Sequence, residues 1–354
     1  MRVLALTRYS SLGPSSRVRF FQYFPALISG GVELTVAPFL GSDYVRNLFA
    51  GKKQPVLSLG RAYLDRLGCL LKSHPFDLLW IEKELFPWLP TRADQLLLRP
   101  GMPCVVDYDD AIFHRYDQHP NPLVRVLLGK KIDGIMRHAA TVVVGNDYLA
   151  GRARLAGASR IELLPSVIDL HHYTVRAQTE GQFRIGWIGS PVTAPYLKLI
   201  RSALEEVLRQ TCARLVLVGA GDQDPLPGLE KEILPWSEEN EVSYIQSFDV
   251  GIMPLLDEPF ERGKCGYKLI QYLACGLPVV ASPVGVNNLI VEQGKIGFKA
   301  SNNSEWIQAL LMLSQDPQLR HTLGQNGRQA VEMKYCLQVT APRLLKIFQD
   351  ALLH

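Results

Sequence analysis

Short apolar runs alternate with longer segments of helical period along the whole chain, and the series starts twice. In the first half the runs lie near Val3–Leu6, Val32–Val36, Leu78–Ile81, Cys104–Val106, Thr141–Val144 and Ile161–Leu163. In the second half they lie at Phe183–Ile188, Leu215–Val218, Val250–Met253 and Pro278–Ala281. Strands that alternate with helices are typical of parallel sheets covered by helices on both faces. The chain is therefore predicted to be an α/β protein with two sheets.

A length of 354 residues exceeds what one hydrophobic core usually supports, so two domains are expected. The stretch 164–182 has no clear period and contains Pro165 and two adjacent histidines, which is typical of a linker. We predict two Rossmann-like βαβ domains, at 1–178 and 179–336. A last helix at about 337–354 is expected to pack back on the first domain.

Composition excludes several classes of protein. The chain is 47% hydrophobic and 20% charged, and its apolar runs are too short to cross a bilayer. The first apolar residues run into Arg8 and Arg17 without a cleavage site, so they predict a strand rather than a signal peptide. Six cysteines lie far apart without C-x-x-C spacing, which favours a reducing, cytoplasmic location.

Charge is divided unevenly between the halves. Residues 1–178 carry 22 basic and 15 acidic side chains, whereas residues 179–354 carry 16 and 19. A basic first half predicts an anionic partner, either a phospholipid surface or a pyrophosphate-linked acceptor, and a solvated basic face is the alternative. No nucleic-acid partner is expected.

Residues 52–72 predict a basic amphipathic helix, at least in part. Its basic members are Lys52, Lys53, Arg61, Arg66 and Lys72, and its apolar members are Leu57, Leu59, Tyr63, Leu64, Leu67, Leu70 and Leu71. One interpretation is peripheral attachment to the inner membrane face. The other is a packed core stripe with a charged outer face.

The strongest chemical signal runs from Glu261 to Asn288. A glycine-bearing loop opens a helix at about Gly266, and the free N–H groups and positive dipole end of such a helix suit a diphosphate. Lys264 and Lys268 add positive charge beside it. The alternative is an ordinary loop–helix–strand packing unit, which occurs in every α/β protein.

This segment resembles the donor-binding core of family 4 (group 1) retaining glycosyltransferases, whose typical form is E-G-F-G-x-x-x-x-E-A-M-A-x-G-x-P-V. The resemblance implies the GT-B fold, in which two Rossmann-like domains face each other across a cleft. It also implies transfer of a hexosyl group from a UDP- or GDP-sugar to an acceptor hydroxyl, with retention and without a metal. The expected setting is polysaccharide or glycolipid synthesis, with a glycan or lipid-linked acceptor bound by the first domain and no cofactor besides the donor.

Two positions depart from the family pattern. Its glutamates fall on Gly263 and Gln271 here. The family uses the first for the donor sugar and the second for the ribose, so Gln271 is expected to keep a ribose hydrogen bond in neutral form. Gly263 cannot replace the first glutamate, and the carboxylates nearby are Asp257, Glu258 and Glu261.

The basic pair that the family carries after the first strand of its second domain is also missing between Gly186 and Tyr196. Lys264, Lys268 and Arg262 are therefore expected to meet the pyrophosphate charge. The other predicted donor-binding residues are Gly13, Arg17, Gly189, Ser190, Thr193, Gly219, Trp236, Pro254, Gly266 and Tyr267. Trp236 offers a face for base stacking, and a tryptophan that merely packs its loop is an equal alternative.

The loop after the first strand contains Gly13, Ser15 and Ser16. The two serines are expected to cap a helix near Arg17. Because cations at a helix start oppose its dipole, Arg17 and Arg19 suggest a bound anion.

A second group follows the strand 104–106: Asp107, Asp109, Asp110 and His114. We predict Ser15, Ser16, Asp107, Asp109 and Asp110 as acceptor-binding residues, and His114, Lys264 and Lys268 as catalytic residues. The aspartates also mimic the D-x-D metal motif of single-lobed enzymes, an interpretation that would leave the downstream nucleotide-binding series without a purpose. The adjacent His171 and His172 lack metal-ligand spacing, and no metal is expected.

Two other functions are compatible with the sequence. A nucleotide-sugar epimerase shares the bilobed fold and needs no acceptor. A catalytically silent GT-B subunit would explain the missing glutamate and basic pair.

Overall fold

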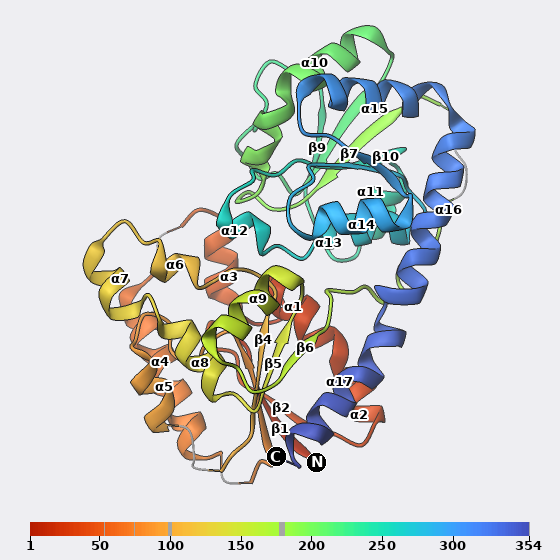
Figure 1. Ribbon diagram of the computed structural model, residues 1–354. Helices are drawn as coiled ribbons and strands as arrows, with labels where there is room; N and C mark the ends of the chain where they lie inside the picture. The colour runs from red at the N-terminus through yellow and green to blue at the C-terminus, as the bar shows by residue number, and fades with distance from the viewer. Residues whose placement is uncertain (53, 74, 98–100, 177–180, 354) are drawn as a thin grey trace. The chain divides into compact units, whose positions relative to one another are not determined.

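The computed structural model describes residues 1–354 except 53, 74, 98–100, 177–180 and 354. Lys53, a member of the predicted amphipathic stretch, lies outside the described residues. The chain divides into two compact units (Figure 1). Unit 1 comprises Met1–Ser166, Gly263–Cys265 and Thr340–His354, and unit 2 comprises Val167–Arg262 and Gly266–Val339.

Unit 1 contains a six-stranded parallel sheet in the order β2-β1-β3-β4-β5-β6. Its strands are β1 (Arg2–Leu6), β2 (Glu33–Val36), β3 (Leu78–Glu82), β4 (Cys104–Tyr108), β5 (Thr141–Val144) and β6 (Ile161–Leu163). The central strands β3, β4 and β5 are buried along their whole length, as expected for continuous apolar runs covered on both faces.

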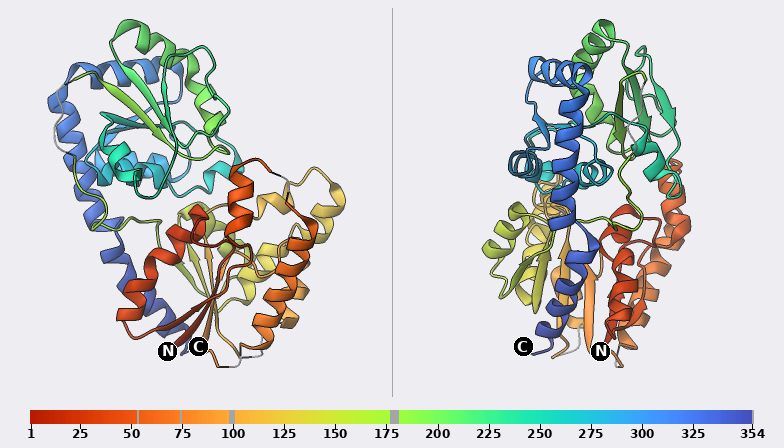
Figure 2. Two further views of the ribbon diagram at one scale, coloured as in Figure 1. Left: turned by 180° about the vertical axis from the view of Figure 1, so that it is seen from behind. Right: turned by 90° about the vertical axis from the view of Figure 1, so that its right-hand side faces the viewer.

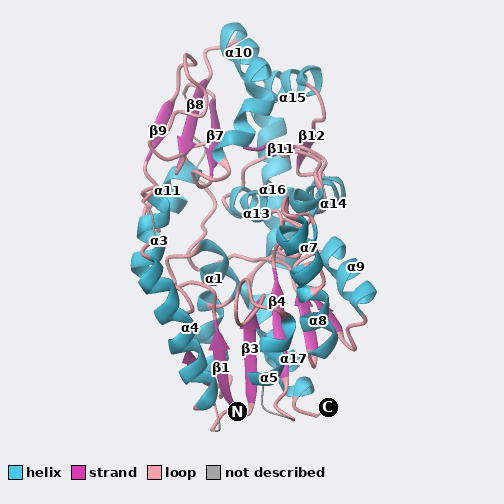
Figure 3. Cartoon of the chain, turned by 90° about the vertical axis from the view of Figure 1, so that its left-hand side faces the viewer, coloured by secondary structure: helices cyan, strands magenta, loops and turns pink. Residues whose placement is uncertain are grey.

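Helices cover both faces of this sheet, with α4, α5 and α8 on one side and α1, α2 and α17 on the other (Figures 1 and 3). The helices are α1 (Pro14–Arg19), the 3-10 helix η1 (Phe21–Tyr23), α2 (Phe24–Ser29), α3 (Ser42–Phe49), α4 (Val56–Leu71), α5 (Thr91–Leu97), α6 (His114–Asp117), α7 (Pro122–Leu128), α8 (Lys131–His138), α9 (Asp147–Ala156) and α17 (Leu337–Ala351).

The C-terminal helix α17 packs into the core of unit 1. The ring of Trp80 on β3 stacks on Phe20 with centroids 4.0 Å apart and meets Phe348 of α17 edge-on at 5.1 Å. Tyr23 and Thr340 join by a buried 3.0 Å hydrogen bond between their hydroxyls. Aromatic burial of this kind holds the end of the chain against a sheet formed by its beginning.

Unit 2 repeats the architecture with a parallel sheet in the order β12-β11-β10-β7-β8-β9. Its strands are β7 (Arg184–Ile188), β8 (Arg214–Val218), β9 (Glu232–Leu234), β10 (Val250–Met253), β11 (Val279–Ala281) and β12 (Gly297–Lys299). Its helices are the 3-10 helix η2 (Ala194–Ile200), α10 (Arg201–Gln210), α11 (Glu241–Gln246), α12 (Pro259–Arg262), α13 (Tyr267–Ala274), α14 (Val286–Gly294), α15 (Asn303–Gln315) and α16 (Pro317–Lys334).

Two hydrophobic clusters fill the two faces of the second sheet. One contains side chains of α11, α13, α14 and α16, and the other contains side chains of η2, α10 and α15. Figure 2 shows helices on both sides of this sheet. The helix α14 directly follows β11, and α13 follows β10 after the short helix α12. Both helices therefore start on the side of the carboxyl ends of the strands, where ligands bind in parallel sheets.

The predicted α/β class is confirmed, and each expected strand is present. The sequence analysis missed the two edge strands of unit 2, β9 and β12. Each is three residues long and only half-buried, and each includes a charged residue, Glu232 or Lys299, so neither produces an apolar run. Among the described residues, no helix combines the length and the apolar character that a membrane span requires.

Candidate functional site

The carboxyl end of β7 forms a tight turn that is held by its own hydroxyl groups. Gly189 follows the strand, and its N–H donates to the carbonyl of Val218 on β8. The Thr193 hydroxyl donates to the carbonyl of Ser190 at 3.1 Å and accepts from the Ser190 N–H at 3.2 Å. The loop therefore presents backbone and hydroxyl groups rather than charges.

A helix start lies beside this turn. Gly266 is the N-cap of α13 with φ +66°, a left-handed conformation that favours glycine, and no side chain caps the first N–H groups of the helix. Lys268, in the first turn, donates to the Thr193 hydroxyl at 3.3 Å, and its Nζ lies 5.3 Å from the ring centroid of Trp187. The carboxyl end of β7, the uncapped start of α13 and the Lys268 side chain therefore lie close together.

Glycine is required where β7 and β8 end together. Gly219 has φ +75°, and a Cβ there would lie 2.4 Å from the Gly189 carbonyl oxygen and 3.0 Å from Cβ of Trp236. Three of the predicted donor-binding residues are therefore neighbours. Pro254 directly follows β10 in a buried position, and Tyr267, the first residue of α13, packs against the core cluster.

Trp236 and Gln271 are linked by a chain of buried polar groups. The indole N–H of Trp236 donates to Glu241 at 2.6 Å, Tyr173 donates its hydroxyl proton to the other oxygen of Glu241, and Gln271 Nε2 donates to the Tyr173 oxygen at 2.8 Å. Gln271 is 3% exposed. These contacts fix the tryptophan in its loop and commit the Gln271 amide hydrogen bond to the protein itself.

Two charged candidates of this region have side-chain partners, and a third lies in a segment of unit 1. Arg262 donates to Asp257 at 2.7 Å, and Glu261 accepts a hydrogen bond from the Tyr196 hydroxyl. Lys264 belongs to the short segment Gly263–Cys265 that packs in unit 1, where Asn146 Nδ2 donates to its carbonyl at 3.1 Å.

The glycine at position 263, where the family pattern has a glutamate, has a steric reason. A Cβ on Gly263 would lie 2.6 Å from Cβ of Ala111 and 2.7 Å from its nitrogen. No larger residue fits without moving that backbone.

In unit 1 the loop after β1 differs from expectation. The helix α1 begins at Pro14 with Gly13 as N-cap and no side-chain cap, so Ser15 and Ser16 lie inside the helix and the predicted capping is wrong. Ser16 is fully buried, accepts from the Tyr9 N–H at 3.0 Å and donates to Glu82 at 2.6 Å. Its hydroxyl therefore links the loop after β1 to the end of β3 by hydrogen bonds.

The arginines of α1 also differ from expectation. Arg19 is the last residue of the helix rather than near its start, and its anion is Asp107, which it binds through Nε at 2.8 Å and Nη2 at 3.0 Å. Both side chains are 1% exposed. This position favours a structural task for Asp107 over contact with an acceptor. Arg17 lies half-buried in the same helix.

The other two aspartates surround a lysine. Lys83 follows β3 with φ +65°, and its Nζ lies 2.8 Å from oxygens of both Asp109 and Asp110. Ser15 donates to the second oxygen of Asp109 at 2.5 Å. Although burial opposes ionisation, Lys83 holds the pKa of Asp109 below its usual range. Sequence reasoning missed Lys83, whose only signal is its place directly after a strand.

His114 is oriented by two neighbours. Its Nδ1 lies 2.8 Å from Asp117, and its Nε2 lies 2.8 Å from the Tyr148 hydroxyl. Because both ring nitrogens are engaged, a hydrogen bond from His114 to a sugar requires one of these two contacts to be given up.

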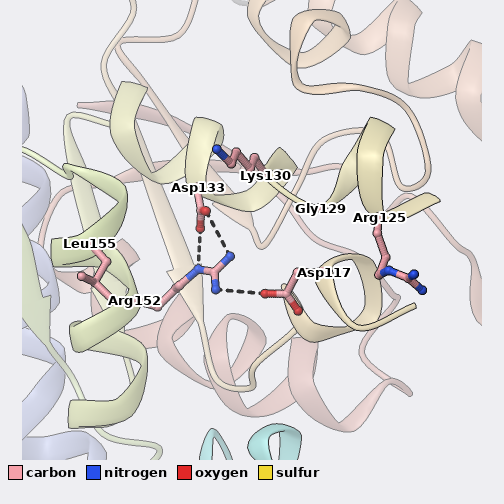
Figure 4. A pocket seen from close by; sticks show the side chains of 7 residues that line it. All are labelled: Asp117, Arg125, Gly129, Lys130, Asp133, Arg152 and Leu155. Carbon is pink, nitrogen blue, oxygen red and sulfur yellow. Dashed lines mark hydrogen bonds and ion pairs between the residues drawn. The ribbon is translucent and has the colours of Figure 1, made fainter. Parts of the chain in front are cut away.

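Asp117 also borders an open hollow of about 360 Å³ (Figure 4). Its wall is formed by Asp117, Arg125, Gly129, Lys130, Asp133, Arg152 and Leu155. Arg152 binds Asp133 at 2.5 Å and Asp117 at 2.9 Å, so both acidic side chains that line this hollow are paired with one arginine. In the described part of the chain, no three His, Cys, Asp or Glu side chains are arranged to hold a metal ion.

Comparisons with known proteins agree with this geometry. Residues 182–316 match the family model of the group 1 glycosyl transferases, so the resemblance seen in the sequence is confirmed for this segment. A curated relative, D-inositol 3-phosphate glycosyltransferase of Paenarthrobacter aurescens, is 32% identical over 111 residues. That match covers 31% of this chain and 26% of the relative.

Solved structures extend the likeness to the whole fold. Sucrose-phosphate synthase of Thermosynechococcus elongatus matches with a TM-score of 0.74 at 16% identity, over 99% of this chain and 98% of that one. Anabaena HepE, solved with UDP-glucose, matches with a TM-score of 0.69 at 15% identity, over 99% and 100%. The two parallel sheets with their helices are thus the GT-B fold.

Proposed function

From a chain that carries a group 1 glycosyl transferase segment in a GT-B fold, we propose a glycosyltransferase that moves a sugar from a nucleoside diphosphate sugar to an acceptor hydroxyl. The observation that carries the proposal is the start of α13, where uncapped N–H groups and Lys268 lie beside the hydroxyl turn of Thr193. These groups suit a diphosphate. The donor is a UDP- or GDP-sugar, and no resident cofactor is needed because the nucleotide sugar is itself a substrate.

The chemistry follows from where charge develops. As the bond between the sugar and the phosphate breaks, negative charge grows on the leaving diphosphate. Prepositioned N–H groups and the Lys268 ammonium stabilise that charge without reorganising. We propose hexosyl transfer without a metal and with retention of configuration, as the family resemblance implies, and a glycan or lipid-linked acceptor.

The experiment has two steps. Thermal shift with a panel of UDP- and GDP-sugars identifies the donor, because a ligand that binds the folded state raises its stability. The selected donor is then incubated with and without an acceptor pool, and NMR determines the anomeric form of the product. A changed sugar without acceptor indicates an epimerase, and binding without turnover on any acceptor indicates a silent subunit. Either outcome contradicts the transferase.

We also propose that α4 binds an anionic membrane surface, which would place the enzyme peripherally on the inner membrane face. Leu57, Leu64 and Leu71 are 89%, 69% and 71% exposed and recur every seven residues on one face, with Arg61 between the first two. The exposed residues Lys52 and Lys72 flank the helix. A leucine stripe with basic flanks suits the interface of anionic lipids.

Co-sedimentation with phosphatidylglycerol vesicles tests this attachment. We expect binding by the wild type, loss of binding in the triple variant with Leu57, Leu64 and Leu71 each changed to Ser, and retention in Leu155→Ser, a control on α9 that is 87% exposed. Equal binding to pure phosphatidylcholine vesicles would argue against the electrostatic part. Concentration-dependent dimers that the triple variant abolishes would assign the stripe to self-association instead.

A further inference from the structure

Asn287 has an unusual environment for a polar side chain. It lies in the first turn of α14, is 1% exposed, and neither its Nδ2 nor its Oδ1 has a hydrogen-bond partner among the described residues. Nearly all buried amides in folded proteins are paired, so an unpaired one needs an explanation. The next residue, Asn288, is ordinary, because its Oδ1 accepts from Lys299 Nζ at 3.0 Å.

The unpaired amide adjoins the candidate donor site. A Cβ on Gly266, the N-cap of α13, would lie only 3.2 Å from Asn287 Oδ1. Asn287 itself follows Gly285, which has φ +53° and starts α14 without a side-chain cap. The starts of two helices and an unpaired side-chain amide therefore lie together at the carboxyl ends of β10 and β11.

The amide's chemistry limits what can satisfy it. Nδ2 needs an acceptor, and Oδ1 needs a donor. A phosphoryl oxygen only accepts, so a diphosphate would leave Oδ1 unpaired. Neighbouring hydroxyls on a sugar ring both donate and accept, so a pair of them satisfies both atoms at once.

Two of the three carboxylates near position 263 have protein partners. Glu261 accepts from Tyr196, and Asp257 pairs with Arg262. Position 263 is a glycine with no room for a side chain.

We propose that Asn287 binds two neighbouring hydroxyls of the donor sugar, while the start of α13 binds the diphosphate. The inference rests on the proposed function and adds a residue that determines which sugar is accepted. A ligand that brings both a donor and an acceptor to the amide explains why the folded chain retains it unpaired. Among the described residues, buried side chains such as Trp80 and Tyr108 have one unpaired polar atom, whereas Asn287 has two.

The test compares Asn287→Leu with Asn288→Leu. Calorimetric titration measures the dissociation constants of UDP, UDP-glucose, GDP and GDP-mannose, and thermal unfolding is recorded without ligand. We expect Asn287→Leu to leave the thermal midpoint unchanged or higher, because leucine removes an unpaired polar group of similar size. Binding of the free nucleotide is expected to stay unchanged, and the ratio of nucleotide-sugar to nucleotide dissociation constants to rise about tenfold. Asn288→Leu should leave that ratio unchanged.

The outcomes distinguish a failure of the Asn287 assignment from a failure of the proposed function on which it rests. An unchanged ratio in Asn287→Leu overturns the assignment of Asn287 alone, and so does a lower thermal midpoint with the ratio kept, which indicates a structural role. A wild type that binds none of the four ligands overturns the proposed function and this inference together. Should the leucine variant fail to fold, Asn287→Ala provides the same ratio.

Discussion

At the end of β4 in unit 1, Asp107 is bound by Arg19, and Asp109 and Asp110 share Lys83. At the end of β7 in unit 2, the turn at Gly189–Thr193 is held by hydroxyl and backbone groups and contacted by one lysine, Lys268. Both edges lie where parallel sheets bind ligands. In the first the contacts join buried charges of opposite sign, whereas the second is built from hydroxyl groups, backbone dipoles and a lysine that contacts a hydroxyl.

This contrast indicates that the carboxyl ends of β4 and β7 have different roles. Charges that are buried and paired belong to the fold, because each needs its partner in order to remain in a low-dielectric interior. A buried amide whose two polar atoms lack partners among the described residues suits a ligand instead. The following experiments test whether that separation holds.

The strongest test removes one partner of the buried pair in unit 1. Arg19→Met leaves Asp107 buried without its cation, and we expect unfolding free energy to fall by about 3–5 kcal/mol. Urea denaturation followed by circular dichroism measures this loss. The control is Arg46→Met, whose pair with Asp43 is 67% and 94% exposed and is worth about 1 kcal/mol or less. Equal stability of wild type and Arg19→Met would show that the buried pair of Arg19 and Asp107 does not stabilise the fold.

The matching change in unit 2 should affect catalysis rather than stability. Lys268→Ala removes the cation beside the start of α13, and we expect turnover to drop about 10²–10³-fold while the thermal midpoint stays within a few degrees. Initial rates with saturating donor measure the effect. Lys198→Ala, an exposed lysine of η2, serves as the control and should retain activity. Transfer at the wild-type rate by Lys268→Ala would remove the phosphate assignment.

The fold could be predicted because its signal is local. Apolar runs of the length of β3 or β8 are read directly from the sequence, and the parallel arrangement follows from the helices between them. The edge strands β9 and β12 escaped because three half-buried residues carry no such run. Their pairing depends on the neighbouring strand.

The site was predictable only in part. Gly266 and Lys268 indicate the start of α13, because a glycine before a helix and a lysine in its first turn lie within a short stretch of sequence. The pairing of Arg19 with Asp107 joins residues 88 positions apart, so Arg19 was assigned to an external anion. The unpaired state of Asn287 likewise depends on packing that no local pattern records.

A smaller effect is expected from backbone strain where β7 and β8 end in unit 2. Gly219→Ala places a Cβ 2.4 Å from the Gly189 carbonyl oxygen at φ +75°, and we expect a loss of about 1–3 kcal/mol of unfolding free energy. Gly60→Ala is the control, because it lies in α4 with nothing within 4 Å and should gain up to about 1 kcal/mol. If Gly219→Ala were as stable as the wild type, the close approach of β7 and β8 would not depend on glycine.

The smallest effect probes a poorly matched buried charge in unit 1. Lys131 Nζ lies 2.8 Å from Glu84 but 3.6 Å from Asp94. Burial raises the pKa of Asp94 to about 7, with Lys131 opposing the shift and Glu84 adding to it. Because the folded pKa exceeds the unfolded one, this group's contribution is full at low pH and is lost as the pH rises through 7.

Between pH 6 and pH 7 the wild type should therefore lose about 1 kcal/mol of unfolding free energy relative to Asp94→Asn. The asparagine cannot ionise and still accepts the Phe86 N–H bond that Asp94 Oδ1 receives at 3.1 Å. Paired urea titrations at the two pH values measure the difference. A parallel response of the two proteins would mean that Asp94 is ionised throughout, and hence that Lys131 together with Arg8, which lies 3.0 Å from Glu84, balances the two carboxylates. Every charge of this cluster would then be matched, which sharpens the contrast with unit 2 instead of weakening it.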